Sequence, residues 1–529
     1  MICYKSLKLS LLLTLIFSST IISQFNNIQI STEGADRPEE VTIAINPNNP
    51  AEIAAGANIN YYFSHADKIT GWKQKQLTSD LGVWGDPCVV FDTKNNLYFA
   101  HLSNPVDGYW IDRIVVQKSE DNGDTWNNGV GVGYNYPKNQ DKEWLAVDHS
   151  KSDYRNNIYM AWTEFDDYGS SDGKDSSRIL FSRSTDEGDT WSSPLKISDV
   201  EGDCIDEDDT VEGAVPTVGP NGEIYIAWAG PLGLMFDKSL DGGISFGKDI
   251  FISDIPGGWA FNVPGVSRCN GFPITACDIS NSEHRGNIYV GWSDQRNGTD
   301  NTDIFFTKST DKGESWSEAV KVNNDNTSRH QFFTWMTVDS TSGNIYLIFY
   351  DRRSTEGNET DVYLARSTNG GDSFENYKIS ESSFIPNPNV FFGDYTNIAA
   401  YNGIVRPIWM RMDNNSLSIW TAEISDSELD IINEVDYSML IADYNLYQNY
   451  PNPFNPSTIL SYSIPKETYV KINVFDILGN KITTLFEGSY KPGIYEVEFI
   501  PEDHLTTGIY FYQIITPEFS QTNKMMFLK

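Results

Sequence analysis

Arginine residues occur at one recurring place in this chain, at or just after the end of an apolar run. Arg296, Arg353 and Arg411 are the three cases. A guanidinium group can donate two parallel hydrogen bonds to one carboxylate, so three arginines on one face of a fold would suit a ligand that carries a carboxylate. The alternative is local ion pairing, because Asp294 and Asp351 stand two residues before Arg296 and Arg353.

A second group of residues that could do chemistry is the acidic loop, residues 201–209 (EGDCIDEDD). Hard oxygen ligands at alternating positions suit Ca²⁺. The loop lacks the full EF-hand pattern, and a solvated acidic turn is the alternative. The chain has no C-x-x-C pair and six His, so we expect no zinc site. We therefore predict no cofactor, with calcium in the acidic loop as the alternative.

The elements that would hold these side chains are marked by an octapeptide with the consensus S-x-D-x-G-x-[ST]-[WF]. Its five copies start 55 to 70 residues apart and are Ser119–Trp126, Ser184–Trp191, Ser239–Phe246, Ser309–Trp316 and Ser367–Phe374. The Asp can hydrogen-bond its own backbone two residues on, the Gly supplies positive φ, and the aromatic residue buries apolar area beside the turn. A unit of this length repeated along a chain predicts a repeat fold.

Each copy follows a short β-type run, and another such run precedes that one. This spacing predicts four-stranded antiparallel blades arranged radially, as in a β-propeller. We count seven strand sets, with six blades as the alternative. The first set, residues 41–78, carries a degenerate copy of the octapeptide from Ser64 to Trp72. The last, residues 396–424, has three strands, and we expect residues 28–31 to add its fourth strand and close the ring.

The octapeptide resembles the Asp box, or BNR repeat, of sialidases and related propellers. The resemblance implies an all-β propeller whose box turns lie away from the substrate face. Long loops gather on the other face, where the central mouth is the default ligand site. The family includes sialidases, other glycan-active proteins and non-catalytic members, so the fold does not fix the activity. Sialidases have six blades, and a count of seven departs from them.

The resemblance also implies a catalytic set. Sialidases use a tyrosine nucleophile, a glutamate that activates it and an aspartate as acid/base. Tyr395, in the context Tyr-Thr-Asn-Ile, is similar to the family's catalytic tyrosine, and Glu212 is similar in position to its glutamate. The loop at residues 58–60 has no Asp for the acid/base role, and Asp394 is the predicted substitute, with Asp86 as another. The alternatives are that Tyr395 packs at the start of a strand and that Glu212 belongs to the acidic loop.

Sialidases bind the carboxylate of their substrate through arginines. By the resemblance, the substrate-binding residues here are Arg37, Arg296, Arg353 and Arg411. Arg37 is followed by Pro38 and is similar to the family's Arg-Ile-Pro element, although the full element is missing. A solvated side chain is the alternative for Arg37.

The C-terminal segment, residues 447–529, reads as a separate seven-strand β-sandwich, because period-two apolar runs alternate with turns. Its opening NYPNPFNPST, its central VFDILG and its closing TGIY resemble the type A sorting domain of the type IX secretion system. The resemblance implies a partner in that secretion machinery and a location outside the cell. An ordinary accessory sandwich is the alternative. Residues 426–446 are polar and acidic and are predicted to be a linker.

The remaining boundaries follow from the N-terminus. Lys5 and Lys8 precede the apolar run at residues 9–17, which predicts a signal peptide over residues 1–24 and a propeller over residues 25–425. We expect no transmembrane segment after its cleavage. The formal net charge of −35 argues against nucleic acid and anionic membranes as partners.

Four cysteines remain after that cleavage, and four cysteines allow three pairings. We favour a Cys269–Cys277 disulfide, which would close one loop.

Two classes of function remain open on the sequence. The first is a secreted or cell-surface sialidase-like exo-glycosidase that acts on terminal acidic sugars. The second is a non-catalytic propeller that binds a glycan or a protein at the cell surface. A polysaccharide lyase that uses the same mouth is a weaker third. The two leading classes are distinguished by whether the arginines, Tyr395 and a carboxylate converge in one pocket.

Overall fold

The computed structural model describes residues 25–65, 71–435, 444–466, 468–490, 493–501 and 505–529. The predicted signal peptide and the centre of the degenerate octapeptide, residues 66–70, lie outside these ranges. The chain divides into two compact units, with the boundary between Ile424 and Ser425. Among the described residues, no helix is long and apolar enough to cross a membrane.

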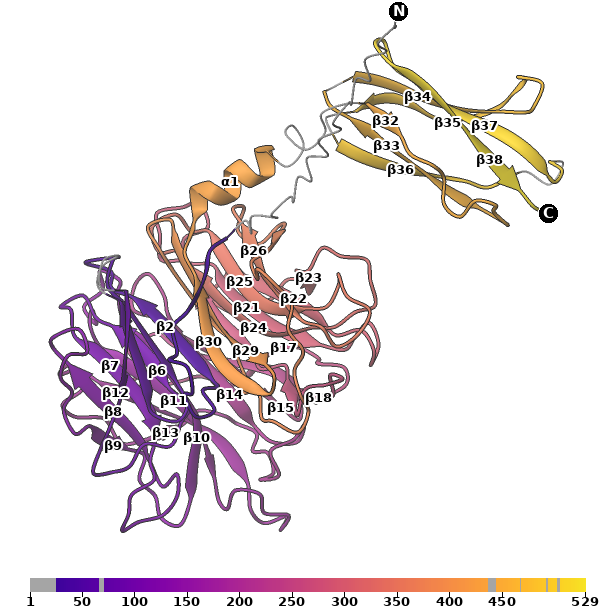
Figure 1. Ribbon diagram of the computed structural model, residues 1–529. Coiled ribbons are helices and arrows are strands. Elements are labelled where there is room, and N and C mark those ends of the chain that lie inside the picture. The colour runs from indigo at the N-terminus through magenta and orange to yellow at the C-terminus, as the bar shows by residue number, and fades with distance from the viewer. Residues whose placement is uncertain (1–24, 66–70, 436–443, 467, 491–492, 502–504) are drawn as a thin grey trace, which may run out of the picture. The chain divides into compact units, whose positions relative to one another are not determined.

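The first unit is built from seven antiparallel sheets that repeat along the chain (Figure 1). Six of them use four consecutive strands each, ordered from the inside of the ring outward. The first three are β2–β5 (Val41–Ile45, Ile53–Ala57, Tyr61–His65, Trp72–Gln76), β6–β9 (Cys88–Phe91, Leu97–Leu102, Ile114–Ser119, Val130–Val132) and β10–β13 (Asn139–Val147, Ile158–Phe165, Ser177–Ser184, Leu195–Lys196). The next three are β14–β17 (Glu212–Val218, Ile224–Gly230, Gly233–Ser239, Ile250–Ser253), β20–β23 (Ile274–Cys277, Ile288–Asp294, Asp303–Ser309, Val320–Lys321) and β24–β27 (Gln331–Val338, Ile345–Asp351, Asp361–Ser367, Glu375–Lys378).

The seventh blade closes the ring with both ends of the unit. It contains β28 (Asn397–Tyr401), β29 (Ile404–Asp413) and β30 (Ser416–Ala422), and its fourth strand is β1 (Asn27–Gln29), which pairs with β30. The short strand β31 (Ile424–Ser425) pairs with β29. The innermost strands contact one another in the closed order β2, β6, β10, β14, β20, β24, β28 and back to β2. The prediction of a seven-bladed propeller closed by an N-terminal strand is therefore confirmed.

Each octapeptide forms a turn between the third and fourth strands of its blade. In the first copy, the Ser119 hydroxyl donates to Asp121 Oδ1 at 2.8 Å and accepts from the backbone N–H of Gly123 at 2.8 Å. Thr125 donates to Asp121 through its backbone N–H at 2.7 Å and through its hydroxyl at 2.6 Å. The three polar positions of the motif thus close the turn on itself, and Gly123 has a φ of +81° that favours glycine.

The octapeptide also joins each blade to the one before it. In four of the five copies, the motif's aromatic residue packs edge-to-face on an aromatic ring of the preceding blade, with Trp316 on Phe236 at a centroid distance of 5.1 Å. The same arrangement occurs in the pairs Trp126–Tyr62, Phe246–Phe181 and Phe374–Phe306. A basic side chain of the preceding blade donates to a backbone carbonyl of the turn, as Lys238 Nζ does to Lys312 O at 2.7 Å. The motif therefore stabilises the ring as well as its own turn.

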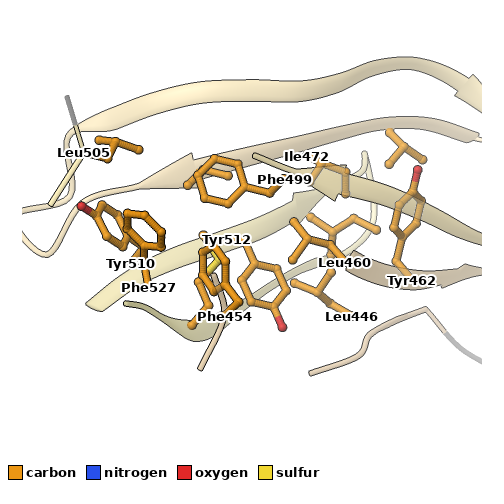
Figure 2. Close-up of a cluster of buried hydrophobic side chains, with 14 of the residues drawn as sticks. Leu446, Phe454, Leu460, Tyr462, Ile472, Phe499, Leu505, Tyr510, Tyr512 and Phe527 are labelled. Atoms are coloured by element: carbon orange, nitrogen blue, oxygen red, sulfur yellow. The ribbon is translucent and has the colours of Figure 1, made fainter. Parts of the chain in front are cut away.

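The second unit is a β-sandwich, as predicted. One sheet contains β32 (Asn445–Leu446), β33 (Thr458–Ile464) and β36 (Gly493–Phe499). The other has the order β35 (Lys481–Tyr490), β34 (Thr468–Phe475), β37 (Gly508–Ile515) and β38 (Ser520–Phe527). Figure 2 shows the buried core of this unit, in which Leu460, Tyr512 and Phe454 are among the packed side chains.

Two expectations from the sequence are corrected. The segment predicted as a linker begins with a helix, α1 (Asp426–Val435). The four cysteines in the described part of the chain are all free and buried, so the Cys269–Cys277 disulfide is not formed. Cys269 lies in the two-residue strand β19 (Cys269–Asn270), just before the blade that starts with β20, and Arg352 and Asp394 are its charged neighbours. Cys277 ends β20 and lies beside Asp278 and Glu223, because the extended strand carries it to the other face of the propeller.

Candidate functional site

The innermost strands begin irregularly where they reach the mouth of the propeller. Glu40, Asp86, Lys142 and Phe333 stand at matching places in four blades and have φ values from +49° to +52°. The pairing register shifts at the same place in β10, β14 and β24. Bulges of this kind re-aim side chains, and left-handed residues other than glycine cluster at functional sites. Here they bring charged side chains of different blades together at the mouth.

Lys142 is the centre of this charged cluster. Its Nζ lies 2.7 Å from Asp394 Oδ2, 3.3 Å from Asp86 Oδ2 and 3.4 Å from Glu40 Oε1. All four side chains are nearly fully buried. Burial alone would lower the pKa of Lys142, but Asp394, Asp86 and Glu40 raise it well above its usual value. Lys142 is therefore a permanent cation at the floor of the mouth.

Arg268 is the second cation of the mouth and comes from the loop between β18 (Ala260–Phe261) and β19 (Cys269–Asn270). Its Nε donates to Asp394 Oδ1 at 2.7 Å, and its Nη1 donates to Asp206 Oδ2 at 2.9 Å. Both oxygens of Asp394 are thus held by cations. Burial would raise the pKa of Asp394, but Arg268 and then Lys142 lower it below its usual value. Asp394 therefore stays ionised, which does not suit a proton donor.

Four other carboxyl groups of the mouth have pKa values that are shifted in the opposite direction. Burial is the main cause that raises the pKa values of Glu40, Asp141, Glu143 and Glu212 well above the usual range. The pKa of Asp86 is lowered, because Lys142 and hydrogen bonds from Glu40 and Asp141 outweigh its burial. The mouth thus contains neutral acids beside ionised ones, an arrangement that enzymes use for acid/base work and that also occurs in structural ion-pair networks.

Glu39, next to this cluster, gives a prediction for pH dependence. Burial raises its pKa from 4.5 to about 8, so folding favours the protonated form. The stability that this form contributes is complete below pH 4.5 and is lost as the pH rises toward 8. As the pH rises from 5 to 8, we expect the wild type to lose about 2–4 kcal/mol of unfolding free energy relative to the Glu39→Gln variant, because the amide of glutamine does not titrate. Urea denaturation at pH 5, 6.5 and 8 measures this, and a difference that does not change with pH would contradict it.

Tyr395 lies in the wall of this cluster. Its hydroxyl donates to Asp86 Oδ1 at 3.4 Å, and its ring packs against Trp144 and Trp335 with centroid distances of 5.7 Å to each. Its side chain is buried. Burial, followed by Asp86 and Glu40, raises the pKa of the hydroxyl well above its usual value. Tyr395 is therefore buried at the start of the last blade, and its hydroxyl contacts the carboxyl group of Asp86 and not that of Glu212.

Above the cluster is a pocket of about 360 Å³. Its floor contains Lys142, Arg268 and Asp394, and one wall is the tilted pair of Trp259 and Phe272, 4.7 Å apart. Ser267 and the acidic loop line its rim. The pocket is concave and combines an aromatic wall with convergent polar groups, as ligand sites do.

The structure brings together three of the seven predicted site residues. Tyr395 and Asp394 contact the same cluster, and Glu212 is buried beside it, where Asp206 and Asp141 act on its carboxyl group. The carboxyl group of Glu212 makes no hydrogen bond to any described residue. Sequence reasoning missed Lys142 and Arg268. The signal that could have found Arg268 is that it is a lone cation in the long loop at residues 253–273.

The four predicted arginines do not converge, which corrects the expected carboxylate-binding group. Arg296 pairs with Asp294, Arg353 with Asp351 at 2.7 Å and Arg411 with Asp413 at 2.6 Å. Each guanidinium is thus paired with a carboxylate two residues away in the chain, and it also hydrogen-bonds the preceding blade or the loop that follows that blade, as Arg353 does with Asn324. The side chain of Arg37 is 71% exposed and lies 3.5 Å from Asp36. None of the four lines the mouth pocket.

The carboxylates of the acidic loop already accept hydrogen bonds from the protein. Asp203 accepts from the hydroxyl of Thr210 at 3.0 Å, Asp206 from that of Tyr168 at 2.7 Å, and Asp208 from the backbone of Ala260 at 2.8 Å. Within the described ranges, no group of three or more His, Cys, Asp or Glu side chains is placed to hold a metal ion.

Comparison with known proteins places the second unit in a family. Residues 448–528 match the model of the secretion system C-terminal sorting domain, which confirms the prediction of a type IX sorting domain. The protein is therefore directed to the outer cell surface or the extracellular space. The match covers only this part of the chain. No curated protein matches the sequence.

Several solved propeller structures are similar to the chain at low identity. The NanB sialidase of Streptococcus pneumoniae is 10% identical, with 71% of this chain and 84% of that chain covered and a TM-score of 0.43. A mutant of Trypanosoma rangeli sialidase that displays trans-sialidase activity is 12% identical, with 86% and 84% covered and a TM-score of 0.42. A polysaccharide lyase, an ulvan lyase, is 13% identical, with 76% and 96% covered and a TM-score of 0.46.

Proposed function

We propose that this protein is a secreted propeller that binds a glycan in the mouth pocket without hydrolysing it. The observation that carries the proposal is the state of the charged groups beneath the pocket. Lys142 and Arg268 are each held by two or more carboxylates, and the predicted arginines are paired elsewhere. The pocket itself offers an aromatic wall and polar groups, which suit a sugar ring with apolar faces and a polar rim.

One observation favours hydrolysis as a second candidate. The hydroxyl of Tyr395 lies 3.4 Å from the Asp86 carboxylate, a tyrosine–carboxylate pair of the kind that the sialidase-like hypothesis requires. A sialidase-like exo-glycosidase would also need a group that binds the acidic sugar. An acidic ligand would instead meet an excess of carboxyl groups around Lys142 and Arg268.

Two measurements test the proposal. We expect no hydrolysis of a fluorogenic α-sialoside by the purified full chain beyond the rate of its Tyr395→Phe variant. Turnover that is lost in this variant would instead establish the hydrolase. For binding, the exposed Ser267 at the rim allows the pocket to be filled without removing an ion pair. On a glycan array we expect Ser267→Trp to weaken binding at least tenfold and Ser267→Ala to change it less than twofold. Equal binding by both variants would contradict a ligand in the mouth pocket.

A further inference from the structure

Five half-exposed aromatic side chains gather on the mouth face of the second and third blades. They are Trp84, Tyr109, Trp110, Tyr134 and Tyr136, with exposed fractions from 40% to 56%, and we call them the aromatic platform. They come from three loops, between β5 and β6, between β7 and β8, and between β9 and β10. The octapeptide turns of these blades connect third and fourth strands and so lie on the opposite face.

The rings of the aromatic platform are held by one another. Tyr109 and Tyr136 lie 4.2 Å apart by centroids, and the Tyr136 hydroxyl donates to that of Tyr109 at 2.7 Å. Trp84 and Trp110 meet edge-to-face at 6.4 Å. The guanidinium of Arg113 lies 4.2 Å above the ring of Tyr134. Because the rings are fixed before any ligand binds, little side-chain entropy would be lost on binding.

The aromatic platform is continuous with the mouth pocket. Trp110 packs edge-to-face on Tyr168 at 5.6 Å, and the Tyr168 hydroxyl donates to Asp206 at 2.7 Å. Asp206 lines the mouth pocket and pairs with Arg268. A ligand longer than the pocket could therefore extend from Asp206 across Tyr168 onto the exposed rings.

The charges around the aromatic platform select against anionic ligands. Arg113 donates twice to Asp112, at 2.8 Å through each nitrogen. Lys138 pairs with Glu164 at 3.1 Å and with Asp166 at 2.9 Å. These cations are neutralised, and the chain as a whole has a formal net charge of −35. A carboxylate or sulfate on a bound sugar would meet these carboxylates, and the two cations beside them, Arg113 and Lys138, are already paired.

We propose that the aromatic platform binds a chain of neutral sugars that continues from the ligand in the mouth pocket. The inference rests on the proposed function and names its ligand class. Apolar C–H faces of a neutral pyranose stack on aromatic rings, and its hydroxyl rim reaches the phenol and indole edges. An exposed aromatic surface of this kind is uncommon unless it serves binding.

The test measures binding of neutral hexasaccharides (cellohexaose, laminarihexaose, mannohexaose and xylohexaose) to the full chain by calorimetry, with hexagalacturonate as the anionic counterpart. We expect at least one neutral hexasaccharide to bind and hexagalacturonate to bind at least tenfold more weakly. Trp84→Ala and Tyr109→Ala should each weaken the binding of the neutral hexasaccharide at least tenfold. Tyr109→Phe, which keeps the ring, should retain most of the affinity. Phe251→Ala removes an exposed ring from β17 outside the aromatic platform and should change the affinity less than twofold.

Other outcomes overturn the inference in distinct ways. If a neutral hexasaccharide binds and only Ser267→Trp weakens it, the aromatic platform is not a sugar site, whereas the proposed function stands. If only the platform variants weaken binding, the platform binds sugars by itself, and both the continuation into the mouth pocket and the proposed function of that pocket are contradicted. Absence of binding by every neutral hexasaccharide, or preferred binding of hexagalacturonate, contradicts a neutral-sugar platform and leaves a protein partner as the explanation for these exposed rings.

Discussion

Replacement of Lys142 by methionine is expected to destabilise the protein by about 3–5 kcal/mol at pH 7, because it leaves buried carboxylates without their cation. Lys142 Nζ lies within 3.4 Å of carboxyl oxygens of Glu40, Asp86 and Asp394, and two of these groups, Asp86 and Asp394, have lowered pKa values. Methionine has a similar volume but no charge, so the loss of unfolding free energy measures the electrostatic contribution of Lys142. Chemical denaturation at pH 7 measures it.

The loss should also depend on pH. Asp394 has a lowered pKa in the folded protein, since Arg268 and Lys142 outweigh its burial. The stability that it contributes is present above its usual value of 3.8 and is lost as the pH falls below that value. In the methionine variant this contribution is smaller, so the two proteins should approach equal stability in acid.

A matched control is available at the surface. Lys248 pairs with Asp199 at 2.7 Å, but its side chain is 87% exposed. Solvent screens such pairs, so Lys248→Met should leave the unfolding midpoint unchanged. If Lys142→Met were as mild as this control, or if its effect were the same at pH 2 and pH 7, Lys142 would not be the cation that keeps Asp394 ionised.

The repeated octapeptide could be interpreted from the sequence because its interactions are local. Asp121 bonds to Ser119 and Thr125, and Gly123 supplies the positive φ, all within eight residues. These rules of turn chemistry need no knowledge of the rest of the chain. The strand sets, five of which contain an octapeptide turn, then set the number of blades at seven, and the three-stranded last set required a fourth strand from the N-terminus. The sandwich followed in the same way from alternating apolar residues.

The mouth could not be predicted in this way because its partners are far apart in the sequence. Lys142 meets Glu40 and Asp394, and Arg268 meets Asp206. No spacing rule predicts from the sequence that such residues meet. They meet because the blades close into a ring. Tyr395 and Asp394 were found by a family resemblance at the start of the last blade, and the structure places them in the cluster without the arginines that the resemblance implied.

The failure of the arginine prediction has a local cause. The carboxylate of Asp351, the partner expected under the local-pairing alternative, lies 2.7 Å from the guanidinium of Arg353. A nearby carboxylate on the same strand needs no ordering of a distant loop, so the local pair forms. The sequence contained this alternative, since Asp294 and Asp351 are visible two residues before their arginines. For a charged residue, the nearest opposite charge in the chain is thus the first competitor of any ligand.

The second large effect is expected at the glycine of the octapeptide. Gly313 has a φ of +80°, and a Cβ atom there would lie 2.3 Å from a ring carbon of Phe236 in the preceding blade. The left-handed conformation costs a non-glycine residue about 1–2 kcal/mol, and forcing a methyl group into a packed core costs about 1–3 kcal/mol. We therefore expect Gly313→Ala to destabilise the protein by roughly 2–5 kcal/mol in chemical denaturation.

A glycine-to-alanine substitution at an unstrained position separates the cost of strain at Gly313 from the general effect of replacing glycine by alanine. Gly357 lies in a loop where a Cβ atom would meet nothing within 4 Å, and its φ is not in the left-handed range. Gly357→Ala should be neutral or stabilise slightly, since alanine restricts the unfolded chain. Phe236 also contacts Trp316 of the same octapeptide, so strain at Gly313 acts on the contact between two blades. If Gly313→Ala were as mild as Gly357→Ala, the contact with Phe236 would not be what fixes glycine in the motif, and the octapeptide would stabilise only its own turn.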